Sequence, residues 1–173
     1  MRTVDVEESA RRALLFLQPG IEFVMTIAQL TEERFDEFVR MIHGLADYER
    51  LRGPDAAAVE RLRQDAFGPS PRFEAALALD DSGAALGYAV WFETYSTFLG
   101  KPTMFLEDLF VREEGRGSGA GGMLFEHVRQ LGAQRGCGRM TWNVLVWNSL
   151  ARDFYHRRGA EWADDWLVYS APY

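Results

Sequence analysis

Hydrophobic and polar residues alternate along the chain with two different periods, and each period predicts one type of element. Apolar residues stand at alternate positions through the first half of residues 21–30, as a half-buried strand requires. Thr31 then precedes two glutamates and an apolar stripe at helical spacing from Phe35 to Ile42. The pattern therefore predicts a strand over residues 21–30 and, after Thr31 as N-cap, a long amphipathic helix.

The rest of the chain continues this alternation of strands and helices, with prolines and glycines between the periodic segments. The predicted elements are a helix over 56–67, a hairpin over 73–79 and 85–94, a strand over 105–111, a helix over 120–135, a central strand over 140–146, a helix over 149–158 and a last strand over 166–169. An early meander followed by alternating strands and helices is typical of α/β proteins. We therefore expect an α/β fold with a central twisted mixed β-sheet flanked by helices.

Length and hydropathy bound the domain organisation. The 173 residues, 47% of them hydrophobic, suffice for one domain with a real core. We expect residues 21–173 to form a single domain and residues 1–20 to be an N-terminal extension of unknown role, with Met25 as a candidate alternative start. No apolar run reaches the length of a membrane span or of a signal-peptide core, so we expect no membrane partner.

The net charge and the cysteine content of the chain exclude some classes of function and favour others. The net charge of −7 argues against non-specific nucleic-acid binding and favours a cationic substrate. Cys137 is the single cysteine, which excludes an internal disulfide and is typical of a reducing cytoplasm. The three histidines show no metal-ligand spacing, so we predict no metal site. We interpret Cys137 and the histidines as structural or solvated.

The segment 105–125 carries the strongest chemical signal. An apolar, β-prone run is followed by eight residues, 115–122, of which five are glycine, and then by a helical pattern. A glycine-rich loop that opens a helix presents unpaired N–H groups, which suit a phosphate or pyrophosphate, and Arg116 adds a positive charge. Residues 117–122 also satisfy G-x-G-x-x-G, but no acidic residue ends the next strand and no Gly-Lys-Ser/Thr closes the loop. A Rossmann or Walker site is therefore disfavoured, and a turn without a ligand stays as the alternative.

Residues 116–121 have the Q/R-x-x-G-x-G/A form, and here the chain resembles the GNAT superfamily of N-acetyltransferases. Five further runs resemble its spermidine/spermine (diamine) N-acetyltransferase branch: residues 45–49, 67–73, 106–111, 147–148 and 154–160. The similarity covers about residues 21–169. It implies a GNAT fold, acetyl-CoA as acetyl donor, a small amine as acceptor and a homodimer.

The resemblance also implies where acetyl-CoA binds. Its pyrophosphate would lie at the glycine-rich loop and the helix start. The implied cofactor-binding residues are Leu109, Phe110, Val111, Arg116, Gly117, Ser118, Gly119, Ala120, Gly121, Gly122, Asn148, Ala151 and Arg158. Asn148 would bond the pantetheine arm or cap its own helix, and Arg157 and Arg158 would pair with phosphates or favour the helix C-terminus.

Two residues are assigned catalytic roles by the resemblance. A phenol can protonate a departing thiolate, the role implied for Tyr155, whose alternative is to pack its helix on the sheet. A carboxylate can accept a proton from an ammonium group, the role implied for Glu107. Asp108 follows it on the predicted strand and so points to the opposite face, where a buried structural carboxylate is an equal interpretation. The N–H groups of Leu109 and Val111 would polarise the thioester carbonyl.

The acceptor site is the least specified part. Tyr48 and Glu49 are expected in the loop after the first long helix, where the resembling enzymes contact the amine, and a solvated loop acid is the alternative for Glu49. The implied substrate-binding residues are Tyr48, Glu49, Glu107, Asp108 and the strand residues Thr141, Trp142 and Asn143. The identities of the last three residues differ from those expected of a strict polyamine enzyme. The acceptor is therefore left open among a polyamine, a diamine and an amino-acid-like amine.

The leading hypothesis is an acetyl-CoA-dependent N-acetyltransferase that works by direct attack of the amine in a ternary complex. The alternatives are acetylation of a protein lysine or N-terminus, acetylation of an aminoglycoside, or, in a different class, a non-catalytic acyl-CoA-binding sensor. A sensor would keep the glycine-rich loop but would not need Glu107 together with Tyr155, so their joint presence favours catalysis.

Overall fold

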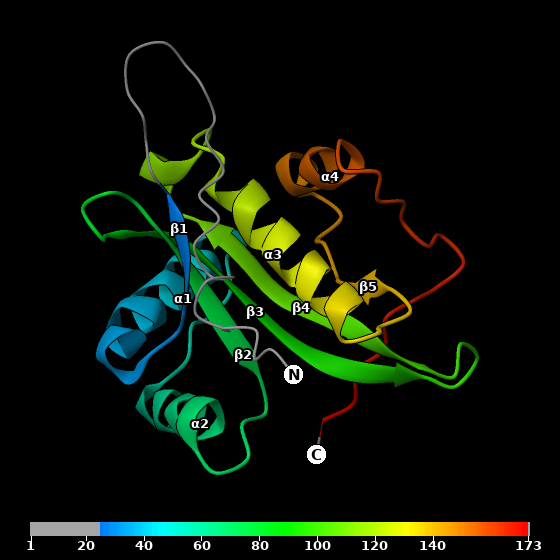
Figure 1. Cartoon of the computed structure of the whole chain (residues 1–173), viewed down its shortest axis with the longest axis horizontal. Coiled ribbons are helices and arrows are strands. Elements are labelled where there is room, and N and C mark those ends of the chain that lie inside the picture. The colour runs from blue at the N-terminus through cyan, green and yellow to red at the C-terminus, as the bar shows by residue number, and fades with distance from the viewer. Residues whose placement is uncertain (1–24, 173) are drawn as a thin grey trace, which may run out of the picture. The chain divides into compact units, whose positions relative to one another are not determined.

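Five strands form one mixed sheet in the order β1-β2-β3-β4-β5 in the computed structural model (Figure 1). The structure describes residues 25–172, so residues 1–20 and the first part of the strand expected over 21–30 lie outside it. The strands are β1 (Thr26–Gln29), β2 (Glu74–Leu79), β3 (Ala85–Ser96), β4 (Lys101–Val111) and β5 (Met140–Thr141). β1 to β4 pair antiparallel, and β5 pairs parallel to β4. The mixed sheet with flanking helices confirms the expected α/β class.

The helices follow the sequence pattern closely. They are α1 (Phe35–Glu49), α2 (Ala56–Phe67), α3 (Ala120–Gln134) and α4 (Ser149–His156), with short 3-10 turns η1 (Glu32–Arg34) and η2 (Glu113–Gly115). Asp55 caps α2 by accepting a hydrogen bond from Ala58 N at 2.8 Å. Thr31 is the N-cap of η1, which runs directly into α1, so the predicted position of the helix start is confirmed. The Thr31 side chain accepts no capping hydrogen bond from the backbone.

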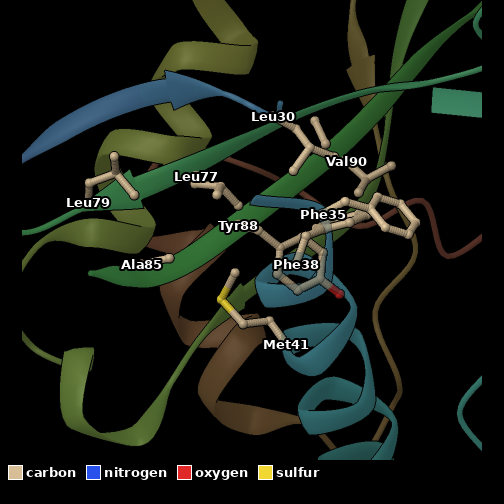
Figure 2. Packing of buried hydrophobic residues seen from close by; sticks show 10 residues of the cluster. Leu30, Phe35, Phe38, Met41, Leu77, Leu79, Ala85, Tyr88 and Val90 are labelled. Carbon is tan, nitrogen blue, oxygen red and sulfur yellow. The ribbon is translucent and has the colours of Figure 1, made fainter. Parts of the chain in front are cut away.

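The core lies on both faces of the sheet. On one face, Phe38 of α1 packs edge-on against Tyr88 of β3, with ring centroids 5.1 Å apart, inside a cluster that also receives Leu77 and Val90 (Figure 2). On the other face, α3 packs on β2, β3 and β4. Gly132 of α3 allows a close approach there, since a Cβ at this glycine would lie 3.2 Å from Met104 Cβ. The sheet is thus fixed between α1 and α3.

The last two predicted strands are not formed as expected. Only Met140–Thr141 of the segment 140–146 is a strand, and it lies at the edge of the described sheet rather than at its centre. Residues 166–169 have no strand assignment and their large apolar side chains are exposed. Apolar and β-branched composition indicates a fit to a pleated surface but does not supply a neighbouring strand. The strand predicted over 140–146 is therefore formed only in part and at an edge, and the strand predicted over 166–169 is not formed.

The described chain divides into two compact units. Residues 25–141 hold the whole sheet with α1, α2 and α3, and residues 142–172 hold α4. None of the helices within residues 25–172 is both long and apolar enough to cross a membrane.

Candidate active site

A β-bulge interrupts β4 at Glu107. Val90 of β3 pairs with Asp108 and Trp91 pairs with Leu106, so Glu107 is the extra residue of β4. The Glu107 side chain is exposed, whereas that of Asp108 is partly buried. A bulge re-aims the side chains around it, and here it gives two adjacent carboxylates different surroundings.

Beyond the bulge, the backbone of β4 points alternate N–H groups away from β3. Arg112 N donates to Leu86 O at 2.8 Å, which makes these two residues a hydrogen-bonded pair of the antiparallel ladder. Because such pairs alternate along the register, the N–H groups of Leu109 and Val111 face the other edge of β4. Within the described sheet, β5 pairs only with Met104 and Phe105 on that edge. The two amides predicted to polarise a carbonyl therefore lie on a stretch of β4 that no strand of residues 25–172 covers.

Asp108 accepts a hydrogen bond from the Tyr88 hydroxyl, with 3.1 Å between Oη and Oδ2. Burial raises the pKa of Asp108 to about 6, and the nearby charges of Glu107 and Glu49 act in the same direction, while the Tyr88 bond opposes them. Burial and the Asp108 charge in turn raise the pKa of Tyr88. Asp108 is thus a partly buried carboxylate, and its hydrogen-bond partner is a tyrosine from the neighbouring strand and not the neighbouring backbone that the structural interpretation expected. No local pattern pointed to this partner beyond the place of Tyr88 on a buried strand.

Tyr48 and Glu49 occupy the last turn of α1 and not a loop, which corrects the prediction. The helix includes both residues because the left-handed Arg50, with φ of 60°, ends it only after Glu49. Burial raises the pKa of Glu49. Because the charge of Glu49 also raises the pKa values of Asp108 and Tyr88, the two carboxylates belong to one negatively charged region.

The segment from β4 to α3 forms the predicted strand, loop and helix. Gly117 and Gly119 have φ of 82° and 97°, values that favour glycine, and Gly119 is the N-cap of α3. Ser118 Oγ donates to Gly115 O at 2.7 Å and accepts from Ala120 N at 3.3 Å, which holds the loop against the helix start. Ala120, Gly121 and Gly122 make up the first turn of α3. Among the described residues, no atom lies within 4 Å of a Cβ built at Gly117, so the loop is open at this position.

Arg116 is exposed and contacts two parts of the first unit. Its Nε donates to Val111 O at 3.4 Å, at the end of β4. Its guanidinium carbon lies 5.2 Å from the centroid of the Tyr48 ring. A residue predicted for the cofactor and one predicted for the acceptor are therefore neighbours.

The second unit holds the remaining predicted residues except Thr141, which lies in β5 opposite Phe105. Asn148 caps α4 by accepting from Ala151 N at 3.1 Å, which confirms the cap interpretation. The Tyr155 ring packs on Trp142, with centroids 4.8 Å apart, and on Phe154 at 5.1 Å. Trp142 and Asn143 are not strand residues, contrary to the prediction, because β5 ends at Thr141.

The contacts of Arg158 agree with the interpretation that its charge favours the C-terminal end of the helix. It donates to Phe154 O at 3.0 Å and stacks on the Phe154 ring at 3.6 Å. Burial lowers the pKa of Arg158. The Arg158 side chain, two residues beyond the end of α4, is therefore held against the last turn of that helix.

Two of the histidines and the cysteine lie in surroundings that agree with a structural or solvated role. His127 packs edge-on against Trp91, with centroids 5.6 Å apart, and burial lowers the pKa of His127. A ring nitrogen of His156 lies 3.1 Å from Ala160 O. Burial raises the pKa of the free Cys137 thiol, as expected for an unreactive cysteine. Among residues 25–172, no group of three or more histidine, cysteine or acidic side chains could hold a metal ion.

Comparison with known proteins agrees with this architecture. The model of the acetyltransferase (GNAT) family matches residues 29–160. The thialysine N-epsilon-acetyltransferase of Bos taurus is 34% identical over 146 residues, which cover 80% of this chain and 85% of that protein. An L-ornithine N5-acetyltransferase of Arabidopsis thaliana is 36% identical over 82 residues, 47% of this chain and 36% of that protein. A human spermidine/spermine N(1)-acetyltransferase-like protein is 30% identical over 130 residues, 72% of this chain and 19% of that protein.

Solved structures share the fold. A ribosomal-protein-alanine N-acetyltransferase from Brucella melitensis superposes with a TM-score of 0.70 at 23% identity, over 87% of this chain and 99% of that one. The protein AAC(6')-Iy, solved with a bisubstrate analogue that contains CoA, gives a TM-score of 0.68 at 22% identity, over 86% of this chain and 98% of that one.

Proposed function

The chain belongs to the acetyltransferase (GNAT) family and is an N-acetyltransferase, and on that premise we propose that it transfers the acetyl group of acetyl-CoA to a primary amine of a small cationic substrate by direct attack in a ternary complex. The observation that carries the proposal is the bulged β4 strand, with Glu107 at the bulge and two outward N–H groups beyond it. The glycine-rich loop and α3 follow within a few residues.

The family uses acetyl-CoA, which supplies the activated thioester. On the protein side, the loop from Arg116 to Gly119 and the first turn of α3 would hold the pyrophosphate through N–H groups and the Arg116 charge. The N–H groups of Leu109 and Val111 would stabilise the negative charge that develops on the carbonyl oxygen during attack. Asn148 and Ala151 are proposed for the pantetheine arm, and Arg158 for a phosphate.

Proton transfer is assigned to two side chains. An alkyl ammonium has a pKa of about 10 and must lose a proton before it attacks, and Glu107 would accept that proton directly or through water. Its exposed position on the bulge leaves the carboxylate accessible. Tyr155 would donate its phenolic proton to the departing thiolate.

The acceptor is proposed to carry a second polar or charged group besides the attacking amine. Glu49 and Asp108 form a negatively charged region of the first unit, and the net charge of the chain is −7. Several of the similar relatives are named for thialysine, ornithine and spermidine or spermine, all of which are small amines with a further ionisable group. Tyr48, Thr141, Trp142 and Asn143 complete the proposed acceptor contacts.

An assay of CoA release tests the proposal, with thialysine, ornithine, spermidine, an aminoglycoside and a lysine peptide as acceptors. We expect turnover with at least one of the three small amines, and intersecting double-reciprocal lines when both substrates are varied. Glu107→Gln and Tyr155→Phe should each lower kcat by about 100-fold or more, since a positioned acid or base contributes that much. Glu60→Gln, at an exposed acid of α2, is the matched control. Turnover with the peptide or the aminoglycoside alone would favour that other class of acceptor, and CoA binding with no acceptor consumed would indicate a sensor.

A further inference from the structure

Tyr48 and Arg116 form a contact between the proposed acceptor region and the glycine-rich loop proposed for the cofactor. Tyr48 belongs to the last turn of α1, beside Glu49 in the proposed acceptor region. Arg116 follows η2 and opens the glycine-rich loop. The guanidinium carbon of Arg116 lies 5.2 Å from the centre of the Tyr48 ring, within the range of a cation–π interaction.

A second contact fixes the other side of the Arg116 side chain. Its Nε donates to Val111 O at 3.4 Å, at the end of the strand that carries the outward N–H groups. An exposed arginine has several freely rotating bonds, and ordering such a side chain costs rotamer entropy. The ring and the carbonyl together restrict the guanidinium before any ligand arrives. Pre-organisation of this kind increases affinity by reducing the ordering that binding requires.

The position of the Tyr48 ring is itself held by close packing of α1 on β4. Gly44 lies one helical turn before Tyr48, and a Cβ at Gly44 would be 3.2 Å from the edge of the Phe110 ring. Phe110 in turn packs on Tyr88, with ring centroids 6.0 Å apart. The end of α1 therefore has little freedom to move relative to the strand from which the loop departs.

We propose that Tyr48 is a positioning residue that holds the Arg116 guanidinium ready for the pyrophosphate of acetyl-CoA. This inference rests on the proposed function, because it assumes that the pyrophosphate binds at the glycine-rich loop. It gives Tyr48 a role toward the cofactor, whereas the resemblance assigns Tyr48 to the acceptor. The role needs the aromatic face of Tyr48 and not its hydroxyl group.

Calorimetric binding of CoA to Tyr48→Leu and Tyr48→Phe tests this role. A cation–π contact at an exposed site contributes about 0.5 to 1 kcal/mol, so Tyr48→Leu should weaken CoA binding by about two- to fivefold. Tyr48→Phe keeps the aromatic face and should bind CoA as the native chain does. In kinetics, the KM for acetyl-CoA should rise in Tyr48→Leu while the KM for S-acetylpantetheine, which has no phosphate, should not change.

A double-mutant cycle separates this positioning role from a general effect on the fold. In an Arg116→Ala background, Tyr48→Leu should cause no further loss of CoA affinity, because the group that Tyr48 positions is absent. Equal losses in both backgrounds would overturn the inference, and so would a rise in the KM for the amine alone. A native chain that does not bind CoA at all would instead refute the proposed function. Matching melting temperatures of the two Tyr48 variants would exclude misfolding as the cause of a difference between them.

Discussion

The Tyr88 hydroxyl donates a hydrogen bond to Asp108 across the β3–β4 pair, at 3.1 Å between Oη and Oδ2. The bond joins the hydrophobic core to the proposed acceptor region, because Tyr88 also packs against Phe38 of α1. Asp108 is thereby kept partly buried beside Glu107, which the bulge leaves exposed. A carboxylate in this position lowers stability at neutral pH and is therefore expected to serve binding.

Asp108→Asn should stabilise the protein at neutral pH. The pKa of Asp108 is raised from 3.8 to about 6, so the folded state binds its proton more tightly than the unfolded state does. The free energy of unfolding of the native chain should consequently fall by up to about 3 kcal/mol between about pH 4 and about pH 6 through this group. Urea unfolding of both proteins across this range measures the difference. A variant whose stability advantage does not grow with pH would contradict the assignment.

The same substitution should weaken binding of the amine. Asparagine keeps an acceptor for Tyr88 but removes the negative charge that we propose attracts a cationic substrate. We expect a higher KM for the amine and an unchanged KM for acetyl-CoA. An unchanged amine KM would mean that Asp108 is only structural.

Tyr88→Phe should raise the pKa of Asp108 further. The Tyr88 hydrogen bond stabilises the ionised carboxylate and lowers its pKa, against the larger effect of burial. Without that donor, a titration of the Asp108 carboxyl carbon by NMR should give a midpoint above that of the native chain. The lost bond should also cost about 1 kcal/mol of unfolding free energy. A lower midpoint would show that the hydrogen bond favours the neutral acid.

Gly117→Ala should reduce CoA affinity, while Gly100→Ala should not. Both glycines have a positive φ, of 82° and 60°, and a Cβ at either would meet no atom within 4 Å. The backbone strain should therefore be similar, about 1 to 2 kcal/mol in each case. Only Gly117 belongs to the loop proposed for the pyrophosphate, whereas Gly100 lies in the β3–β4 turn. Equal CoA affinity in the two variants, measured by calorimetry, would argue against the loop as the binding site.

Gly87→Ala should lower the stability of the sheet itself. The added Cβ would clash with Phe110 O of β4 and lie 3.0 Å from Val111 Cα, both backbone atoms that cannot turn aside. The variant should unfold at a lower urea concentration. Its free energy of unfolding should be lower by about 1 to 3 kcal/mol, the range found for overpacked sites. Gly136→Ala is a comparison in which only backbone strain applies, since open space surrounds that glycine. A smaller loss in Gly87→Ala than in Gly136→Ala would contradict the close approach.

Local signals in the sequence located most elements, and non-local pairing accounts for what they missed. Helix α2 was predicted with its observed bounds because glycine and proline flank it on both sides, and in the structure Asp55 caps it. The strand, glycine-rich loop and helix from β4 to α3 were also predicted, since each depends on neighbouring residues. The bulge at Glu107 depends on the register with β3, and the Tyr88–Asp108 bond joins residues that are 20 positions apart. No local pattern carries that information.

The shortened β5 and the absent strand over 166–169 have a related cause. Whether a β-prone segment becomes a strand depends on a neighbour with free backbone groups, which composition does not report. The position of Tyr48 and Glu49 was missed for a different reason. The glycine and proline at positions 53 and 54 indicated only approximately where the helix ends. The residue that does end α1 is the left-handed Arg50, and an arginine at this position is not recognisable as a helix end in the sequence, as a glycine would be.

Mass analysis of the amine after incubation with the protein and acetyl-CoA distinguishes amine acetylation from hydrolysis of acetyl-CoA. We expect thialysine, ornithine or spermidine to gain one acetyl group for each CoA released, and we expect Glu107→Gln nearly to abolish the product while Glu60→Gln does not. Release of CoA without an acetylated amine, or no release with any of these amines, would contradict the proposed function.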